Sequence, residues 1–308
     1  MALVSSVVRV GRMIITAGAF AAFYSGAAIL SWILLPLLTR GEDRLVHRAL
    51  CSQALVRRAF ILFHDFMRVC RLLDFDPRRD VLRLPEGACV VVANHPTLVD
   101  VTALIAAGGP MCVVAKPELS NSIAFGRLLR HCWHIDVSGD DGLAASSVVG
   151  EAMTRLQAGL RVLIFPEGTR SPEGGLGRFH RGAFQIAAWA GVPVVPLFLR
   201  CDPPVLSKTA PWYRAPRIVP HLSLQQLPTL LPESWPNAAA MAAAVRAGYG
   251  RLLQNRAFGL DTAEHCAEQR TQPAPCSDQH GHCPEMLLRG SNMDTAEYAI
   301  APGPGERS

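Results

Sequence analysis

The sequence predicts an α/β fold in which a mostly parallel sheet is flanked by helices, preceded by an N-terminal membrane helix. The first observation is that short apolar runs, rich in β-branched residues, alternate with helical patterns from about residue 83 onward. Such alternation is typical of parallel strands, because each crossover needs a helix to bring the chain back. The second observation is that residues 13–38 contain no charged side chain.

The elements of the α/β domain are predicted from their local patterns. Apolar runs predict strands at 88–93, 111–115, 133–137, 161–165 and 192–199, with a late strand at 221–227. The patterns between them predict helices at 97–107, 121–132, 143–158, 181–190 and, in an alanine-rich stretch, 237–256. The domain therefore covers 81–260, and the polar, irregular composition of 261–308 predicts a disordered tail.

Residues 1–42 are predicted to be a membrane anchor. The uncharged run 13–38 would form a helix of about 39 Å, which is long enough to cross a bilayer with tilt. A cleaved signal peptide is the alternative, with a cleavage site near 17–19, but the apolar run continues well beyond it and favours a retained anchor. Gly18, Gly26 and Pro36 leave a kinked or re-entrant hairpin open as a second arrangement.

Residues 43–80 form the next predicted segment, in which apolar side chains recur at helical spacing between arginines. An amphipathic helix on the membrane and an ordinary core helix both fit this pattern. More arginines follow the anchor than precede it, which predicts a bacterial-type inner-membrane protein with its α/β domain on the cytoplasmic side. The arginines that follow are Arg40, Arg44, Arg48, Arg57 and Arg58.

The composition also favours a membrane protein, since 50% of the residues are hydrophobic and 18% are charged. A net charge of +5 suits an anionic lipid surface, and no basic-aromatic pattern indicates nucleic acid as a partner. Nine cysteines are scattered, several within apolar elements, as expected of reduced thiols. The cysteines and histidines of residues 265–283 lack paired metal-ligand spacing, so no metal site is predicted.

Polar residues follow two of the predicted strands. After 88–93 comes Asn94-His95-Pro96-Thr97-Leu98-Val99-Asp100, and open sheets place active sites at such strand ends. His95 is the candidate general base, because imidazole titrates near neutral pH. Five residues on one helix turn through about 500°, so His95 and Asp100 meet only if the histidine lies in the loop and the aspartate in the first helical turn. Pro96 favours a helix start here.

The second segment, Phe165-Pro166-Glu167-Gly168-Thr169-Arg170-Ser171, follows strand 161–165 and is predicted to bind substrate through Glu167, Gly168, Thr169 and Arg170. Gly168 permits a close backbone approach, and Arg170 can place two donors on a phosphate. Glu167 would either bind the acceptor or order Arg170. Lys116 follows strand 111–115 and is predicted to add a phosphate contact, with a solvated lysine as the alternative.

These segments resemble the motifs of the phospholipid/glycerol acyltransferase family. The family's histidine, four residues and aspartate correspond to His95 and Asp100, and residues 165–171 match its Phe-Pro-Glu-Gly-Thr-Arg-Ser motif throughout. Lys116 fits its basic second motif, and the Val-Pro-Val-Val-Pro strand stands at 192–196. Thr97 replaces the usual serine, and the arginine that often follows the strand near 133–138 is absent, which leaves the acceptor lipid open.

The resemblance implies transfer of a fatty acyl group from acyl carrier protein or acyl-CoA to the hydroxyl of a lysophospholipid, without a cofactor. The default acceptor is 1-acylglycerol 3-phosphate, and another lysolipid or a glycolipid is the alternative. No Gly-x-Ser-x-Gly sequence is present, which favours direct attack of the hydroxyl on the thioester over an acyl-enzyme. A membrane esterase or lipase and a silent membrane adaptor are the weaker alternatives.

Overall fold

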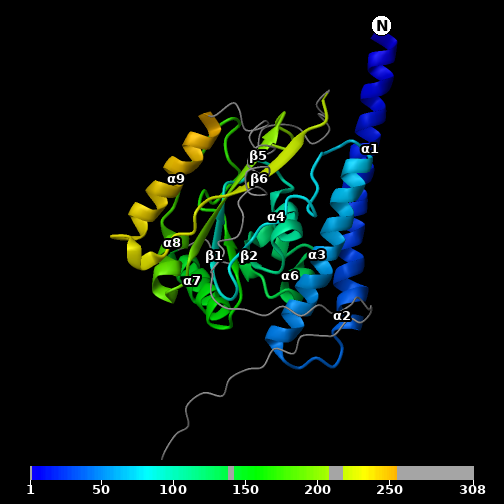
Figure 1. Cartoon of the computed structure of the whole chain (residues 1–308). Coiled ribbons are helices and arrows are strands. Elements are labelled where there is room, and N and C mark those ends of the chain that lie inside the picture. The colour runs from blue at the N-terminus through cyan, green and yellow to red at the C-terminus, as the bar shows by residue number, and fades with distance from the viewer. Residues whose placement is uncertain (1, 138–141, 208–217, 255–308) are drawn as a thin grey trace, which may run out of the picture. The chain divides into compact units, whose positions relative to one another are not determined.

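The computed structural model describes residues 2–137, 142–207 and 218–254, and within them a six-stranded sheet in the order β3-β2-β4-β1-β5-β6 (Figure 1). The first five strands pair in parallel, and β6 pairs with β5 in the antiparallel sense. The predicted α/β fold with a mostly parallel sheet is thereby confirmed. The strands are β1 Val90–Ala93, β2 Cys112–Ala115, β3 Ile135–Asp136, β4 Val162–Ile164, β5 Val194–Asp202 and β6 His221–Gln226.

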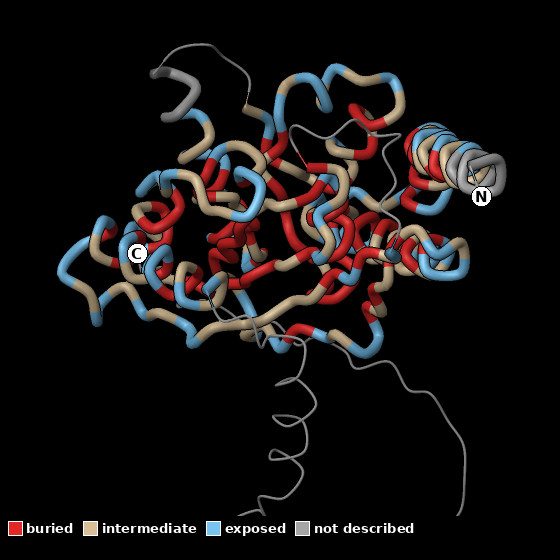
Figure 2. The backbone as a smooth tube through the Cα atoms, turned by 90° about the horizontal axis from the view of Figure 1, so that it is seen from above, coloured by how far each residue is buried: buried red, intermediate tan, exposed pale blue. Residues whose placement is uncertain are grey.

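Helices cover both faces of the sheet, so its central strands are buried on both sides (Figures 1 and 2). Successive side chains of a strand point to opposite faces. Val91 of β1 accordingly belongs to the core under α3 (Leu45–Val69) and α4 (Asp100–Gly108). Val90 belongs to the core on the other face, whose helices are α7 Gly142–Gln157, α8 Gly182–Ala190 and α9 Ala238–Gln254.

The N-terminal helix runs without interruption, but it changes from α-helix to π-helix and back. It runs as α1 (Ala2–Ile29), a π-helical stretch η1 (Leu30–Leu34) and α2 (Leu35–Leu38), passing Gly18 and Gly26 without a break. The change of type comes just before Pro36, whose missing N–H cannot join an α-helical ladder. Val10–Leu38 is long and apolar enough to cross a membrane, judged by length and composition.

This helix lies beside α3 and against the α/β domain (Figure 1). The Phe23 ring of α1 lies 5.0 Å from Phe63 of α3 and 5.5 Å from Phe125, measured between centroids. Ser31 and Trp32 of the π-helical stretch donate hydrogen bonds to the carbonyls of Ala124 and Ile123 respectively. The N-terminal helix therefore makes specific contacts with the domain that carries both polar motifs.

Several predicted boundaries differ from the structure. The single helix expected at 121–132 is instead α5 (Pro117–Ser120) and α6 (Gly126–His131), separated by a turn. The strand expected at 133–137 has only two residues in the ladder, because only Ile135 and Asp136 pair with β2. A short 3-10 helix, Pro232–Ser234, precedes α9. The predicted tail 261–308 lies outside the described residues, and the proposed domain boundaries stay predictions.

Candidate active site

The two polar segments meet because β1 and β4 are neighbours in the sheet. Val92 of β1 pairs with Ile164 of β4 in the parallel sense, so the loops that follow both strands emerge at the same end of the sheet. The backbone N–H of His95 donates to Ser171 Oγ at 3.0 Å, and the Ser171 N–H donates to the His95 carbonyl at 2.8 Å. This reciprocal pair joins the loop that carries the histidine to the loop that carries Arg170.

Asn94 fixes the end of β1 to β5 on its other side. Its side-chain amide donates to the Leu199 carbonyl at 2.8 Å, and its side-chain oxygen accepts from the Leu199 N–H at 2.7 Å. The buried amide thus continues the strand pairing by one side chain after β1 has ended. His95, the next residue, consequently starts from a backbone that is held on both sides.

Asp100 binds His95 as the spacing predicts. His95 Nδ1 lies 2.7 Å from Asp100 Oδ2, and the Asp100 side chain is fully buried. Asp100 is the first residue of α4, where the helix dipole stabilises a carboxylate. The helix was predicted to begin at about residue 97, after Pro96, but it begins at Asp100. Residues 97–99 form a bend and a turn before it.

Thr97 organises that turn and secures the carboxylate. Its backbone N–H donates to Asp100 Oδ2 at 2.7 Å, and its hydroxyl donates to Oδ1. With His95 included, three donors converge on the Asp100 carboxylate. A carboxylate only accepts, so the hydrogen on His95 is assigned to Nδ1. The basic lone pair of the imidazole is then on Nε2. A general base needs this nitrogen unprotonated so that it can accept a proton.

The imidazole plane is set by a ring contact that the sequence did not predict. The rings of His95 and Phe165 stack, with centroids 4.3 Å apart and an angle of 21° between their planes. The His95 side chain keeps 18% of its surface exposed, while its partner Asp100 has none. A histidine held by a buried carboxylate and one aromatic face, with one edge open, suits proton abstraction from a bound hydroxyl.

Glu167 is buried and binds its own loop. It accepts from the Ser171 hydroxyl and, at 2.6 Å, from the backbone N–H of Gly177. A Cβ atom at Gly177 would lie 2.7 Å from Glu167 Oε2, so a larger residue would displace the Glu167 carboxylate. The described contacts of Glu167 therefore order the loop through Ser171 and Gly177. The two roles predicted for Glu167, binding the acceptor or ordering Arg170, stay predictions. Gly168 has φ of 65°, which explains glycine at that turn.

Arg170 reaches across to the chain that follows β5. Its Nη1 donates to the Leu206 carbonyl at 2.9 Å and to the Ser207 carbonyl at 3.1 Å. Thr169 beside it is partly buried. The guanidinium is thus anchored through one nitrogen. The predicted contacts of Thr169 and Arg170 with substrate stay predictions, as do those of Glu167 and Gly168.

Lys116 is exposed at the carboxyl end of β2 and caps the short helix α5. In the sheet order, β4 separates β2 from β1. Strands are about 4.8 Å apart, so Lys116 leaves the same edge roughly 10 Å from the end of β1. A lysine side chain covers only part of such a distance, and its phosphate contact stays a prediction.

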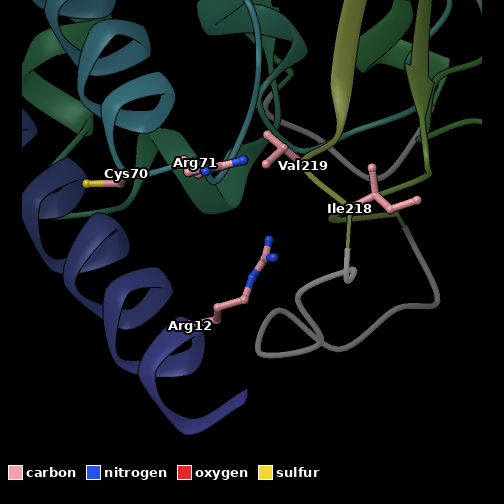
Figure 3. A pocket seen from close by; sticks show the side chains of 5 residues that line it. All are labelled: Arg12, Cys70, Arg71, Ile218 and Val219. Carbon is pink, nitrogen blue, oxygen red and sulfur yellow. The ribbon is translucent and has the colours of Figure 1, made fainter. Parts of the chain in front are cut away.

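A cavity of about 480 Å³ opens beyond the carboxyl end of β5, where β6 begins (Figure 3). Arg12 of α1 and Arg71, just after α3, point into it, with Ile218 and Val219 on the far wall (Figure 3). None of the predicted site residues lines it. The hydrogen-bonded His95 and Asp100, rather than the size of this cavity, therefore define the candidate active site.

Comparison with known proteins bears directly on these two loops. The acyltransferase family model matches residues 77–200, which include both loops. Over these residues the chain is similar to the acyltransferase family. It is similar to the 1-acyl-sn-glycerol-3-phosphate acyltransferase of Pseudomonas aeruginosa, with 34% identity over 120 residues, 39% of this chain and 47% of the relative.

The chain is also similar to the 1-acyl-sn-glycerol-3-phosphate acyltransferase alpha of Mus musculus, with 32% identity over 153 residues, which cover 46% of this chain and 53% of that protein. The chain thus matches about half the length of these acyltransferase relatives. The crystal structure of the 1-acyl-sn-glycerophosphate acyltransferase PlsC from Thermotoga maritima has a similar fold, with a TM-score of 0.58 and 17% identity. That match covers 89% of this chain and all of the other.

The residues of this site that had no assigned role include Ser171, Asn94 and Gly177. Asn94 precedes His95 and Ser171 follows Arg170 in the sequence. Their polar side chains next to predicted site residues could have indicated a role. Gly177 carried no such signal, because its contact with Glu167 depends on how the loop folds back. In the described residues no group of acidic, cysteine or histidine side chains is arranged to hold a metal ion.

Proposed function

We propose that this protein is an O-acyltransferase that moves a fatty acyl group from acyl carrier protein or acyl-CoA to the hydroxyl of a lysophospholipid. The default acceptor is 1-acylglycerol 3-phosphate, which would give phosphatidate. The observation that carries the proposal is the contact of His95 Nδ1 with the buried Asp100 carboxylate, which leaves Nε2 as the acceptor. The family match and the names of the relatives support the same reaction class.

The reaction follows from the orientation of the imidazole. Nε2 takes the proton of the acceptor hydroxyl as its oxygen attacks the thioester carbonyl. The resulting tetrahedral oxyanion collapses, the carbon–sulfur bond breaks, and the leaving thiolate takes the proton from the imidazolium. Asp100 stabilises that imidazolium and holds its orientation throughout. A thioester already has a good leaving group, so no nucleophilic side chain is needed.

Arg170 is proposed to bind the anionic headgroup of the acceptor. Both of its described contacts use Nη1, so the Nε–Nη2 edge remains for a two-point contact with phosphate. The loop carrying Arg170 is tied to His95 through Ser171. This connection would fix the distance between the headgroup and the reacting hydroxyl. Lys116, at the same sheet edge, would add a second positive charge.

The N-terminal helix is proposed to anchor the protein so that the acceptor reaches the active site within the bilayer plane. Val10–Leu38 has the required length and composition, and its contacts with Ala124 and Ile123 hold it to the catalytic domain. The arginines that follow the helix favour a cytoplasmic position for that domain.

The test is product analysis by mass spectrometry, with purified full-length protein given mixed lysolipids together with acyl carrier protein or CoA thioesters. The proposal predicts an acylated lipid that requires both acceptor and thioester, with phosphatidate the main product. Release of free fatty acid from intact phospholipid without a thioester would instead identify an esterase or lipase. Activity that persists in folded His95→Ala would contradict the mechanism.

A further inference from the structure

A separate cavity of about 260 Å³ lies between the first turns of α3 and helix α6. Its lining side chains are Arg48 from α3 and Arg127, Arg130 and His131 from α6. His131 ends α6 just before β3 begins, whereas His95 follows the end of β1. Because these strands are parallel, the cavity lies toward their amino ends and the candidate active site toward their carboxyl ends.

The positive charge of this cavity is not balanced by nearby carboxylates. Among the described residues, Arg48, Arg127 and Arg130 take part in no salt bridge, and a guanidinium stays charged at all relevant pH. Burial lowers the pKa of His131, and the charges of Arg127, Arg48 and Arg130 lower it further. Three arginines therefore act on one point, as an anion site requires.

The apolar N-terminal helix contacts one of these arginines. The Arg127 guanidinium lies 4.6 Å from the centroid of the Trp32 ring, within the range of a cation–π contact. Trp32 is 51% exposed, and its neighbours Ile33 and Leu37 are also exposed. Tryptophan prefers the boundary between headgroups and acyl chains. Arg127 thus connects the positive charge of the cavity to an apolar surface that belongs to the candidate membrane span.

We propose that the cavity formed by Arg48, Arg127, Arg130 and His131 binds the phosphate headgroup of an anionic glycerophospholipid of the bilayer. The headgroup occupies the cavity, and its acyl chains lie along the exposed side chains near Trp32. Basic pockets beside membrane helices recognise lipid headgroups in this way. An acidic protein could bind the same arginines, but its binding would not explain the exposed apolar side chains beside them. The site does not depend on acyl transfer.

The test is native mass spectrometry of the full-length protein in detergent micelles, titrated with phosphatidylglycerol or phosphatidylcholine. The expected result is retention of phosphatidylglycerol in preference to phosphatidylcholine. An arginine near a charged bilayer contributes about fivefold in affinity, so Arg127→Gln with Arg130→Gln should weaken retention by about 30-fold. The matched control, Arg83→Gln with Arg251→Gln, removes two exposed arginines elsewhere and should change retention less than about twofold.

Several outcomes would overturn the proposal: equal losses in the two double variants, no preference between the two lipids, or displacement of the lipid by an equal concentration of inorganic phosphate. Retention of an acidic carrier protein in place of the lipid would also overturn it. His95→Ala should keep the lipid, which separates this result from failure of the proposed acyl transfer.

If the double variant does not fold, the wild type still decides by nuclear magnetic resonance of His131. A bound phosphate offsets the field of the arginines, so phosphatidylglycerol should raise the pKa of His131 and phosphatidylcholine should not. An unchanged pKa with phosphatidylglycerol would contradict the proposed site.

Discussion

His95 and His64 both bind side chains in the first turn of α4, one from the loop after β1 and the other from α3. His95 meets the Asp100 carboxylate, and His64 Nε2 lies 3.0 Å from the hydroxyl of Thr102. The Thr102 hydroxyl donates to the Val99 carbonyl, so His64 must be the donor in its pair. Both histidines therefore present a hydrogen to the same turn, yet their other nitrogens face different surroundings.

The difference is one of partner charge and access. His95 keeps an exposed edge and contacts a buried carboxylate. His64 is 1% exposed, its Nδ1 has no hydrogen-bond partner in the described part of the chain, and burial lowers its pKa to about 4. A histidine suited to proton transfer needs both features, whereas His64 has the geometry of a helix contact between α3 and α4.

The largest expected effect is on His95. His95→Ala should lower kcat by at least about 10⁴-fold while leaving the melting temperature close to that of the wild type, because the side chain is partly exposed. Acyl transfer and thermal unfolding of the same preparation measure both. His64→Gln is the matched control on the other side of the comparison, and its kcat should change less than about threefold. Equal losses in the two variants would remove the distinction between the histidines.

Asp100→Asn should give the next largest effect, a fall in kcat of about 10²–10⁴-fold. An amide can present its N–H to His95 and so favour the wrong imidazole tautomer, and it weakens the bonds from Thr97. The readout is kcat together with KM for the acceptor, which should change little. A variant with near-normal kcat would show that His95 does not need a negative partner.

The comparison extends to the second loop through Arg170. Arg170→Lys keeps the charge but loses the two-point contact, so the KM for the acceptor should rise by about tenfold or more. The KM for the acyl donor should change little. Steady-state kinetics with each substrate varied separately give both values. Arg178→Lys, a change at another arginine outside the motif, serves as the control. An unchanged acceptor KM would limit Arg170 to holding Leu206 and Ser207.

The smallest expected effect on activity, and a distinct one on stability, belongs to His64. Its folded pKa of about 4 lies below the ordinary value of 6.5, so the folded state favours neutral imidazole. The associated stability is fully present above pH 6.5 and is lost as the pH falls from 6.5 to about 4, by about 3 kcal/mol in all. His64→Gln should reduce this loss in detergent-solubilised protein, followed by thermal unfolding. If stability depends on pH identically in the wild type and in His64→Gln, another group must cause the loss of stability in acid.

The sequence was most informative where chemistry and local pattern coincide. The strand ends, the loop position of His95 and the place of Asp100 in the first turn of α4 all followed from patterns within a dozen residues. The helix start was wrong by three residues, since Thr97 uses its hydroxyl and N–H to cap Asp100 rather than to begin the helix. Whether a threonine side chain binds a neighbouring residue or joins the helix depends on side-chain geometry, which hydrophobic periodicity does not predict.

The parts that were not predicted depend on contacts between distant residues. Asn94 and Leu199 are 105 positions apart, and the stack of His95 on Phe165 joins the segments that follow β1 and β4. The division between α5 and α6 follows from a turn in which the Gly126 N–H binds the Ser122 carbonyl. A Cβ atom at Gly126 would lie 2.3 Å from the Ser120 carbonyl oxygen, so this turn requires glycine. Such a role appears only after the chain has folded.

The protonation state of His95 tests the central claim most directly. Nitrogen-15 resonance of histidine-labelled protein, with His95→Ala used to assign the signal, reports which ring nitrogen carries hydrogen when the ring is neutral. The Asp100 contact predicts hydrogen on Nδ1 and a lone pair on Nε2, and in Asp100→Asn this preference should weaken. A neutral His95 that carries its hydrogen on Nε2 in the wild type would contradict its role as the base.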